Sequence, residues 1–395
     1  MNKEFYLGVD VAKYQHQATL INSRGMIIGQ SFQFSNSQAG FDFLWGRIKK
    51  QLPQKAVVIV GMEATGHYYW HLKDYFIQQG ITVKVFNPIE TQTLAKTKIR
   101  KVRNDRLDSL LIAELTSKKQ CLPLKNEKEK VKQLRELTRF SEKLKGQARF
   151  YKQEISSLME RLCPEFSAHF SQIFLKTPLM MIKEYFLNNV SKEELIEKIV
   201  RTSKARIKKD KAREIVLILD NSLGKNYRWE NSKLQLRLLL QSLTLVETQI
   251  KEVRENIKKL SSKFKEVEYL TSIKGISHYL ASVILGEVGK IDKFSNKKQL
   301  TAFAGLDPSV KQSGSYNRKQ GNHISKRGSK YLRRQLYYAA KTAVIFDPEL
   351  KAFYEKKKAQ GKHYNVIIIA VARKLLMRVY VLLKQKRPYE LRIAA

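Results

Sequence analysis

The spacing of hydrophobic residues changes several times along the first 115 residues and predicts an α/β unit. Three β-rich runs come first, at residues 5–11, 16–22 and 26–34, and a turn-prone segment at 23–25 separates the last two. We expect them to form an antiparallel meander. A helical stretch at 41–51, a short apolar run at 56–62, a helix at 67–79, a strand at 81–86 and a helix at 104–116 follow. Three meander strands and then alternating helices and strands predict an α/β ribonuclease-H-like (RuvC-like) fold.

Two later stretches carry apolar residues at heptad spacing, which predicts a helical coiled-coil region. The first lies within residues 124–165, where Pro164 ends it, and the second runs from 239 to 264. The seams comprise Leu134, Leu137, Ser141, Leu144, Ala148, Tyr151, Ile155, Leu158 and Leu162, and then Leu239, Leu243, Val246, Ile250, Val253, Ile257, Leu260 and Phe264. These helices pair either within one chain, as an antiparallel stalk, or between chains, and the sequence does not decide. The insert at 166–230 is helical in composition, and its basic segment at 204–213 favours a solvated helix face over RNA contact.

The last third of the chain predicts a mainly α-helical domain. Residues 270–289 indicate a turn followed by a helix, similar to a helix-hairpin-helix element, although Ser277 stands where a second glycine is expected. The stretch 311–334 has eight basic residues and no acidic one, and a helical region at 348–383 closes the fold. We therefore expect three domains, at 1–120, 121–268 and 269–395.

The charge of the chain points to a polyanionic partner. The sequence has 75 Lys and Arg residues against 36 Asp and Glu, a formal net charge of +39. Nucleic acid is the commonest polyanion that such a surface binds, because binding releases condensed counterions. Aromatic residues interleave with the basic ones near the C-terminal end, but a core role is as probable as base stacking, so they receive no assignment.

Several classes of protein are excluded by what the sequence lacks. Two cysteines, Cys121 and Cys163, cannot build a disulfide framework or a Cys-rich zinc site. The N-terminal segment has no apolar signal-peptide stretch, and the apolar run at 366–372 is too short to cross a membrane. Neither a Walker A pattern nor GxGxxG occurs. We expect a cytoplasmic protein.

Four acidic residues of the first domain form a candidate metal site. Asp10 lies in the first strand among apolar neighbours, and Glu63 ends the apolar run at 56–62. Asp105 and Asp108 are three residues apart and share one face of a helix. Two Mg²⁺ ions held by such carboxylates can clamp the attacking and leaving oxygens of a phosphodiester. Each residue alone is more often a helix cap or a surface charge, and Asn104 or Asp105 can cap the last helix; the four in this order favour a metal site.

Five stretches of the sequence resemble the DEDD transposases of insertion sequences, the bridge-RNA-guided recombinases of the IS110 and IS1111 group. GVDVAK, GMEATG and KVRNDRLDSLLIAEL are similar to the three acidic motifs of the family, and they give Asp10, Glu63, Asp105 and Asp108. Ser109 replaces the usual small residue after the last aspartate. LTAFAGLDPSVKQSG and ISKRGSKYLRRQL are similar to the C-terminal transposase domain of the family. The resemblance covers nearly the whole chain and implies a protein that works on bacterial nucleoid DNA.

The resemblance implies a serine nucleophile that attacks a DNA phosphate and stays covalently attached. At the matching position this sequence has Ser313, and Ser309 and Ser315 are the nearby alternatives. It also implies a structured non-coding RNA whose loops pair with target and donor duplexes, and a site composed from different domains of a dimer or tetramer. The surrounding basic residues would then hold the phosphate backbone. They are Lys311, Arg318, Lys319, Lys326, Arg327, Lys330, Arg333 and Arg334.

Two other functions fit the residues. The first is a metal-dependent junction nuclease in which water attacks the phosphate and Ser313 is a turn residue. The second is a non-catalytic nucleic-acid scaffold, for which the four carboxylates would be dispensable. Covalent protein–DNA adducts distinguish the recombinase from both.

Overall fold

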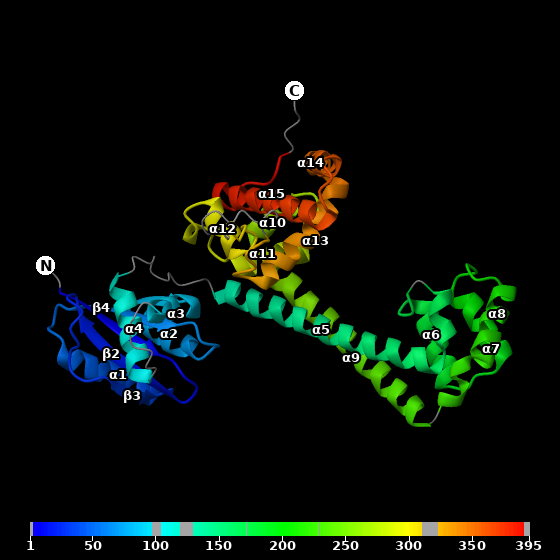
Figure 1. Ribbon diagram of the computed structural model, residues 1–395, viewed down its shortest axis with the longest axis horizontal. Coiled ribbons are helices and arrows are strands. Elements are labelled where there is room, and N and C mark those ends of the chain that lie inside the picture. Colours follow the sequence, from blue (N-terminus) through cyan, green and yellow to red (C-terminus); the bar gives the residue numbers. More distant parts are fainter. Residues whose placement is uncertain are drawn as a thin grey trace, which may run out of the picture. The chain divides into compact units, whose positions relative to one another are not determined.

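The computed structural model describes residues 3–96, 104–118, 129–170, 172–228, 230–309 and 323–390. It divides the chain into two compact units, Met1–Lys128 and Glu129–Ala395 (Figure 1). The three-domain division expected from the sequence stays a prediction, and the stalk and the C-terminal helices both belong to the second unit.

A five-stranded mixed sheet forms the centre of the first unit. Its strands are β1 (Glu4–Asp10), β2 (Gln15–Asn22), β3 (Phe32–Ser35), β4 (Val57–Glu63) and β5 (Thr82–Phe86), in the order β3-β2-β1-β4-β5. β1, β2 and β3 pair antiparallel, and β4 and β5 continue the sheet in parallel from β1. The predicted meander and the two later strands are therefore confirmed.

The third strand is shorter than the predicted run at 26–34. Ile27 makes only an isolated bridge to Ile21, and β3 begins at Phe32. Gly25 and Gly29 have φ values of +81° and +70°. That left-handed backbone leaves the extended region, so the apolar pattern there does not become one continuous strand.

Helices cover both faces of the sheet. α1 (Gln38–Gln51) and α2 (Tyr69–Gln78) bury their apolar sides in one core with the side chains of β1 and β4 that face them. α4 (Asp105–Lys118) packs on the opposite face, where Tyr6, Ile21 and Ala113 form a smaller cluster. Predicted helices 41–51, 67–79 and 104–116 match α1, α2 and α4, whereas α3 (Pro88–Lys96) was not predicted.

The two heptad stretches pair within one chain, which the sequence left open. α5 (Glu129–Leu162) and α9 (Glu230–Ser261) are the long helices of the second unit and lie against each other in Figure 1. They run antiparallel, because Leu134 shares a buried cluster with Ile257 and Lys152 pairs with Glu247 at 2.8 Å. The burial of Leu236 and Leu240 shows that the second seam begins earlier than predicted.

Smaller helices close each end of the stalk. α6 (Lys176–Phe186), α7 (Lys192–Thr202) and α8 (Lys209–Asn221) share a core with Leu144 and Val246, as the helical composition of the insert predicts. In the basic segment of this insert, Lys211 and Arg213 form exposed ion pairs three residues along the helix, which agrees with a solvated face. Short 3-10 turns lie at Pro164–His169, Leu223–Tyr227 and Ile291–Lys293.

The other end of the stalk carries the C-terminal helices. They are α10 (Lys265–Thr271), α11 (His278–Val288), α12 (Lys297–Phe303), α13 (Lys330–Phe346), α14 (Pro348–Ala359) and α15 (Tyr364–Gln385). The turn between α10 and α11 packs on α13, where a Cβ at Gly275 would lie 2.6 Å from the amide nitrogen of Ala343. Ser277 caps α11 by accepting a hydrogen bond from the amide of Leu280. In the part of the chain that the structure describes, no helix is long and apolar enough to cross a membrane.

Candidate functional site

Asp10 and Glu63 lie at the carboxyl ends of neighbouring parallel strands. The last paired residues of β1 and β4 are Val9 and Met62, and each carboxylate follows directly. Because side chains alternate along a strand, both point to the face of the sheet that α4 covers. The strand pairing therefore brings together two carboxylates that are more than fifty positions apart in the sequence.

Two glycines let α4 lie directly on these strands. Gly8 of β1 and Gly61 of β4 are partners in the parallel ladder, and we call this pair the glycine notch. A Cβ atom at Gly8 would overlap the carbonyl oxygen of Ser109 and the amide nitrogen of Ala113, and would lie 2.8 Å from Ala113 Cα. At Gly61 it would overlap the hydroxyl of Thr116. Glycine inside a strand commonly marks such a close backbone approach.

The start of α4 holds the other two carboxylates. Asn104 caps the helix, with its Oδ1 accepting a hydrogen bond of 2.8 Å from the amide of Leu107. Of the two caps considered from the sequence, Asn104 is therefore the one in place. Asp105 and Asp108 lie in the first turn, where negative charge is favourable next to the helix N-terminus.

Ser109 ties this helix to the sheet. Its side chain is fully buried, and its hydroxyl lies 2.7 Å from Thr19 Oγ1 on β2. Asp105 precedes Ser109 by four residues and therefore shares its helix face. The glycine notch and this hydrogen bond position the first turn of α4 over the end of β1.

The carboxylates interact electrostatically at Asp10. Its pKa is raised from 3.8 to about 6, first by burial and then by the negative charges of Asp108, Asp105 and Glu63. The backbone amide of Val11 donates a hydrogen bond to Asp10, which opposes the rise. The other three predicted carboxylates therefore all lie within electrostatic range of Asp10.

Two threonine hydroxyls orient Glu63. Thr65 donates to Oε1 at 3.0 Å, and Thr91 of α3 donates to Oε2 at 2.6 Å. Thr91 is nearly buried, so this contact is sheltered from solvent. No sequence pattern points to Thr91, because the helix that carries it is not predicted from the sequence.

The donor set suits a hard divalent cation, since such ions prefer carboxylate oxygens. A cation would also relieve the repulsion that raises the pKa of Asp10. Among the residues that the structure describes, no three His, Cys, Asp or Glu side chains are already close enough to share one ion. Joint coordination therefore requires rotation of these side chains.

Ser313 and Ser315 lie outside the described residues, but the chain on both sides of them is defined. Pro308 and Ile324 form an antiparallel bridge. The amide and hydroxyl of Ser309 both donate to the carbonyl of His323, at 2.7 and 2.8 Å. Both the amide and the hydroxyl of Ser309 are thus engaged by the backbone of His323.

The predicted basic residues differ in their surroundings. Lys326, Arg327 and Lys330 are exposed. Arg333 instead donates to the carbonyl of Ala304, and Arg334 pairs with the buried carboxylate of Glu142. Lys311, Arg318 and Lys319 lie outside the described residues.

A buried carboxylate connects the stalk to the start of α13. Glu287 is 1% exposed and accepts two hydrogen bonds from Arg139 of α5, at 2.6 and 2.9 Å, and one of 2.7 Å from Ser329. Burial alone would raise the pKa of Glu287, but the bonds from Arg139 and Ser329 hold it below its usual value. Ser329 also caps α13, so this network fixes the start of the helix that carries Lys330, Arg333 and Arg334.

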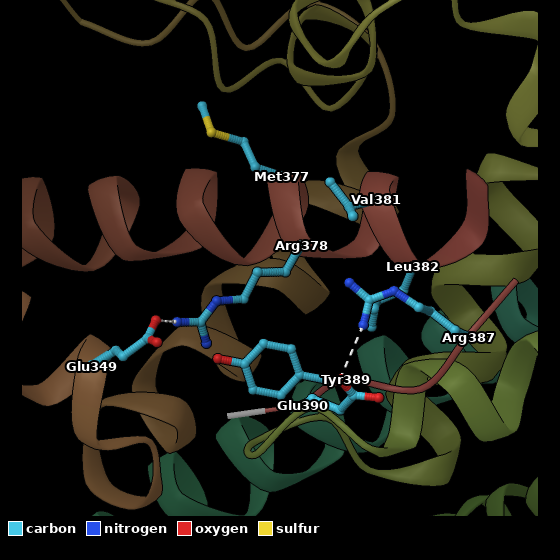
Figure 2. Close-up of a pocket in the computed structure, with 8 residues that line it drawn as sticks. All are labelled: Glu349, Met377, Arg378, Val381, Leu382, Arg387, Tyr389 and Glu390. Carbon is cyan, nitrogen blue, oxygen red and sulfur yellow. Dashed lines mark hydrogen bonds and ion pairs between the residues drawn. The ribbon is translucent and has the colours of Figure 1, made fainter. Parts of the chain in front are cut away.

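Residues 387–390, which we call the C-terminal strap, line a separate hollow of about 270 Å³ together with α14 and α15 (Figure 2). Arg378 of α15 pairs with Glu349 and lies 4.7 Å from the ring centre of Tyr389. Arg387 and Glu390 pair across the strap in the same view. None of the predicted site residues lines this hollow, and its charges are already paired, so we assign it a structural role.

Two family models match the chain. Residues 7–164 match a model of the IS110 DEDD type described as "Transposase", and residues 267–355 match one described as "Transposase IS116/IS110/IS902 family". The first range contains all four carboxylates, and the second contains Ser313.

The chain is also similar to curated proteins of insertion elements. A "pilin gene-inverting protein" of Moraxella lacunata is 25% identical over 98% of both chains. The IS110 43.6 kDa protein of Streptomyces coelicolor is 29% identical over 40% of this chain and 38% of its own length. A transposase for IS1111A of Coxiella burnetii is 28% identical over 35% of this chain and 39% of its own.

Proposed function

Because the chain belongs to the IS110 family of transposases, we propose that it cuts and rejoins DNA through a serine nucleophile assisted by divalent metal ions. We propose further that a bound structured RNA selects the target and donor DNA. The observation that carries the metal part is the crowding of three carboxylates around Asp10 at the carboxyl ends of β1 and β4.

The strand order β3-β2-β1-β4-β5 supports a ribonuclease-H-like fold for the first unit. On this proposal, residues 1–120 are the catalytic carboxylate domain, 121–268 the coiled-coil region and 269–395 the domain of the serine. Because α5 and α9 pair antiparallel within one chain, this helix pair would act as a spacer between the groups of helices at its two ends. Homo-oligomers in which one chain supplies the serine and another the carboxylates would complete the site.

Asp10, Glu63, Asp105 and Asp108 would hold the metal, as two Mg²⁺ ions. Bound there, the ions would neutralise charge on the phosphate and on the leaving oxygen. Thr65 and Thr91 would keep the Glu63 carboxylate oriented, and the glycine notch would keep α4 at its height above the strands. In this arrangement the hydrogen bonds and the packing of α4 would position the carboxylate oxygens that bind the metal.

The serine step exchanges one phosphodiester for another. The hydroxyl oxygen of Ser313 forms a bond to phosphorus while the bond from phosphorus to a deoxyribose oxygen breaks. The hydroxyl gives up its proton and the leaving oxygen takes one up, so the reverse reaction can rejoin a new end. A full-length relative named for gene inversion supports rejoining over hydrolysis, because inversion requires resealed ends.

The exposed cations beside this segment would hold nucleic-acid phosphates. Lys326, Arg327 and Lys330 carry exposed side chains and can therefore reach a phosphate in solution. Such contacts position the duplex without reading its bases. With a net charge of +39, the chain has cations for an RNA as well as for two duplexes.

The decisive test is the formation of a covalent adduct. Full-length protein is purified with its copurifying RNA, and labelled DNA matching the loops of that RNA is added with Mg²⁺. We expect a protein–DNA adduct that Ser313→Ala and Asp10→Asn abolish and that Ser309→Ala and Ser315→Ala retain. Adducts that survive Ser313→Ala would move the nucleophile elsewhere, and cleavage without any adduct would support a water-attacking nuclease.

A further inference from the structure

A buried histidine lies on β2, the strand that pairs with β1 next to Asp10. His16 is on β2, is 1% exposed and packs between Phe34 and Phe41, with ring centres 5.1 and 6.1 Å away. Its side chain faces the core shared with α1 and α2, on the side of the sheet opposite to Asp10. An aromatic or aliphatic side chain would satisfy that core equally well, so the imidazole needs another explanation.

The imidazole holds the backbone of the turn after Asp10. His16 Nδ1 accepts a hydrogen bond of 3.1 Å from the amide of Ala12. Because Nδ1 accepts this bond it carries no proton, so the ring is the neutral tautomer with its proton on Nε2. Burial lowers the pKa of His16, partly opposed by the nearby Asn36 side chain, and this keeps the ring neutral.

The amide next to this hydrogen bond points at the carboxylate. The backbone N–H of Val11 bonds to Asp10, and the N–H of Ala12 bonds to His16. Consecutive peptide planes share one Cα, so fixing the Ala12 amide restricts the orientation of the Val11 amide. Asn36 secures the rest of the turn, because its side chain donates to the carbonyl of Lys13 at 3.1 Å.

We propose that His16 is a positioning residue that sets the orientation of the Asp10 carboxylate through the amides of Ala12 and Val11, and thereby the affinity of the site for a divalent cation. The inference rests on the proposed metal role of Asp10. Partners that orient a metal ligand typically change metal affinity by about 10–100-fold when they are removed. His16 acts one step further away, so we expect the lower end of that range.

The test compares variants that keep or remove the acceptor. His16→Asn offers an amide oxygen near the position of Nδ1, whereas His16→Leu and His16→Phe fill the core without an acceptor. His71→Leu is the matched control, because His71 is exposed on α2. Each full-length protein is titrated with Mn²⁺, free ion is followed by electron paramagnetic resonance, and the fold is checked by circular dichroism.

We expect His16→Leu and His16→Phe to bind Mn²⁺ about 10-fold more weakly, with His16→Asn and His71→Leu within about 3-fold of wild type. Either acceptor-free variant that folds is sufficient for the comparison. Wild-type affinity in a folded acceptor-free variant would overturn the role of His16, as would equal loss in the Asn, Leu and Phe variants. Failure of the proposed function has a different signature, because wild-type protein and Asp10→Asn would then bind Mn²⁺ alike.

Discussion

The glycine notch makes a testable prediction about how the carboxylates are assembled. In Gly8→Ala the new Cβ would lie 2.8 Å from Ala113 Cα and would overlap the backbone of Ser109. Carbon atoms prefer a separation of about 3.5–4.0 Å, so α4 must retreat by roughly 1 Å. Because the obstacle is backbone, no change of side-chain rotamer can relieve it.

Both stability and activity should respond. Overpacking of this kind costs about 1–3 kcal/mol of unfolding free energy. The retreat also carries Asp105 and Asp108 away from Asp10, and a misplacement of about 1 Å at a catalytic centre can lower the rate by about 10²-fold. We therefore expect Gly8→Ala to lose far more activity than its stability loss explains.

The assay pairs urea unfolding of the full-length chain with the initial rate of DNA adduct formation. Gly46→Ala is the control, because Gly46 lies in α1 and a Cβ there meets no atom within 4 Å. That control should keep activity and gain up to about 1 kcal/mol of stability, since alanine is favoured over glycine inside a helix. Wild-type stability and rate in Gly8→Ala would refute the notch as the device that positions α4.

Three further predictions concern charge. Because the folded-state pKa of Asp10 is raised from 3.8 to about 6, the folded protein retains this proton longer, so metal-free stability should fall as pH rises from about 4 to 6. Allowing for partial exposure, the loss of unfolding free energy over this pH range is about 2 kcal/mol. Asp10→Asn should abolish this pH dependence in urea unfolding measured from about pH 4 to 6. An Asp10→Asn protein with the pH dependence of wild type would contradict the crowding at Asp10. Arg139→Met should destabilise the chain by about 3–5 kcal/mol because it removes the charged donor of the fully buried Glu287 carboxylate. Replacing both residues by methionine should cost less, and equal losses in thermal unfolding would argue against a buried ion pair. Lys326→Ala and Lys330→Ala should each weaken duplex binding and reduce the slope of log affinity against log salt by about 1, and unchanged slopes in fluorescence anisotropy would remove these residues from the phosphate contacts.

Local patterns were sufficient to predict most elements of the fold. The alternation of strands and helices in the first unit and the two heptad seams follow from side-chain periodicity, which depends only on nearby residues. The third strand was predicted too long because the run at 26–34 is apolar enough for a strand, while the backbone at Gly25 and Gly29 adopts positive φ. α3 was missed because Pro88–Lys96 has a weak apolar pattern.

The sequence by itself singled out Asp10, Glu63, Asp105 and Asp108 as candidate metal ligands, since they stand in recognisable motifs. Tertiary structure alone decided what surrounds them. The ladder between β1 and β4 aligns Asp10 with Glu63, the glycine notch admits α4, and Thr91 and His16 support the two strand carboxylates from separate elements. Likewise, only the packed structure showed that α5 and α9 pair within one chain. The physical reason is the same in each case: a heptad or a motif specifies the chemistry of a surface, whereas the partner of that surface depends on contacts between residues far apart in the chain.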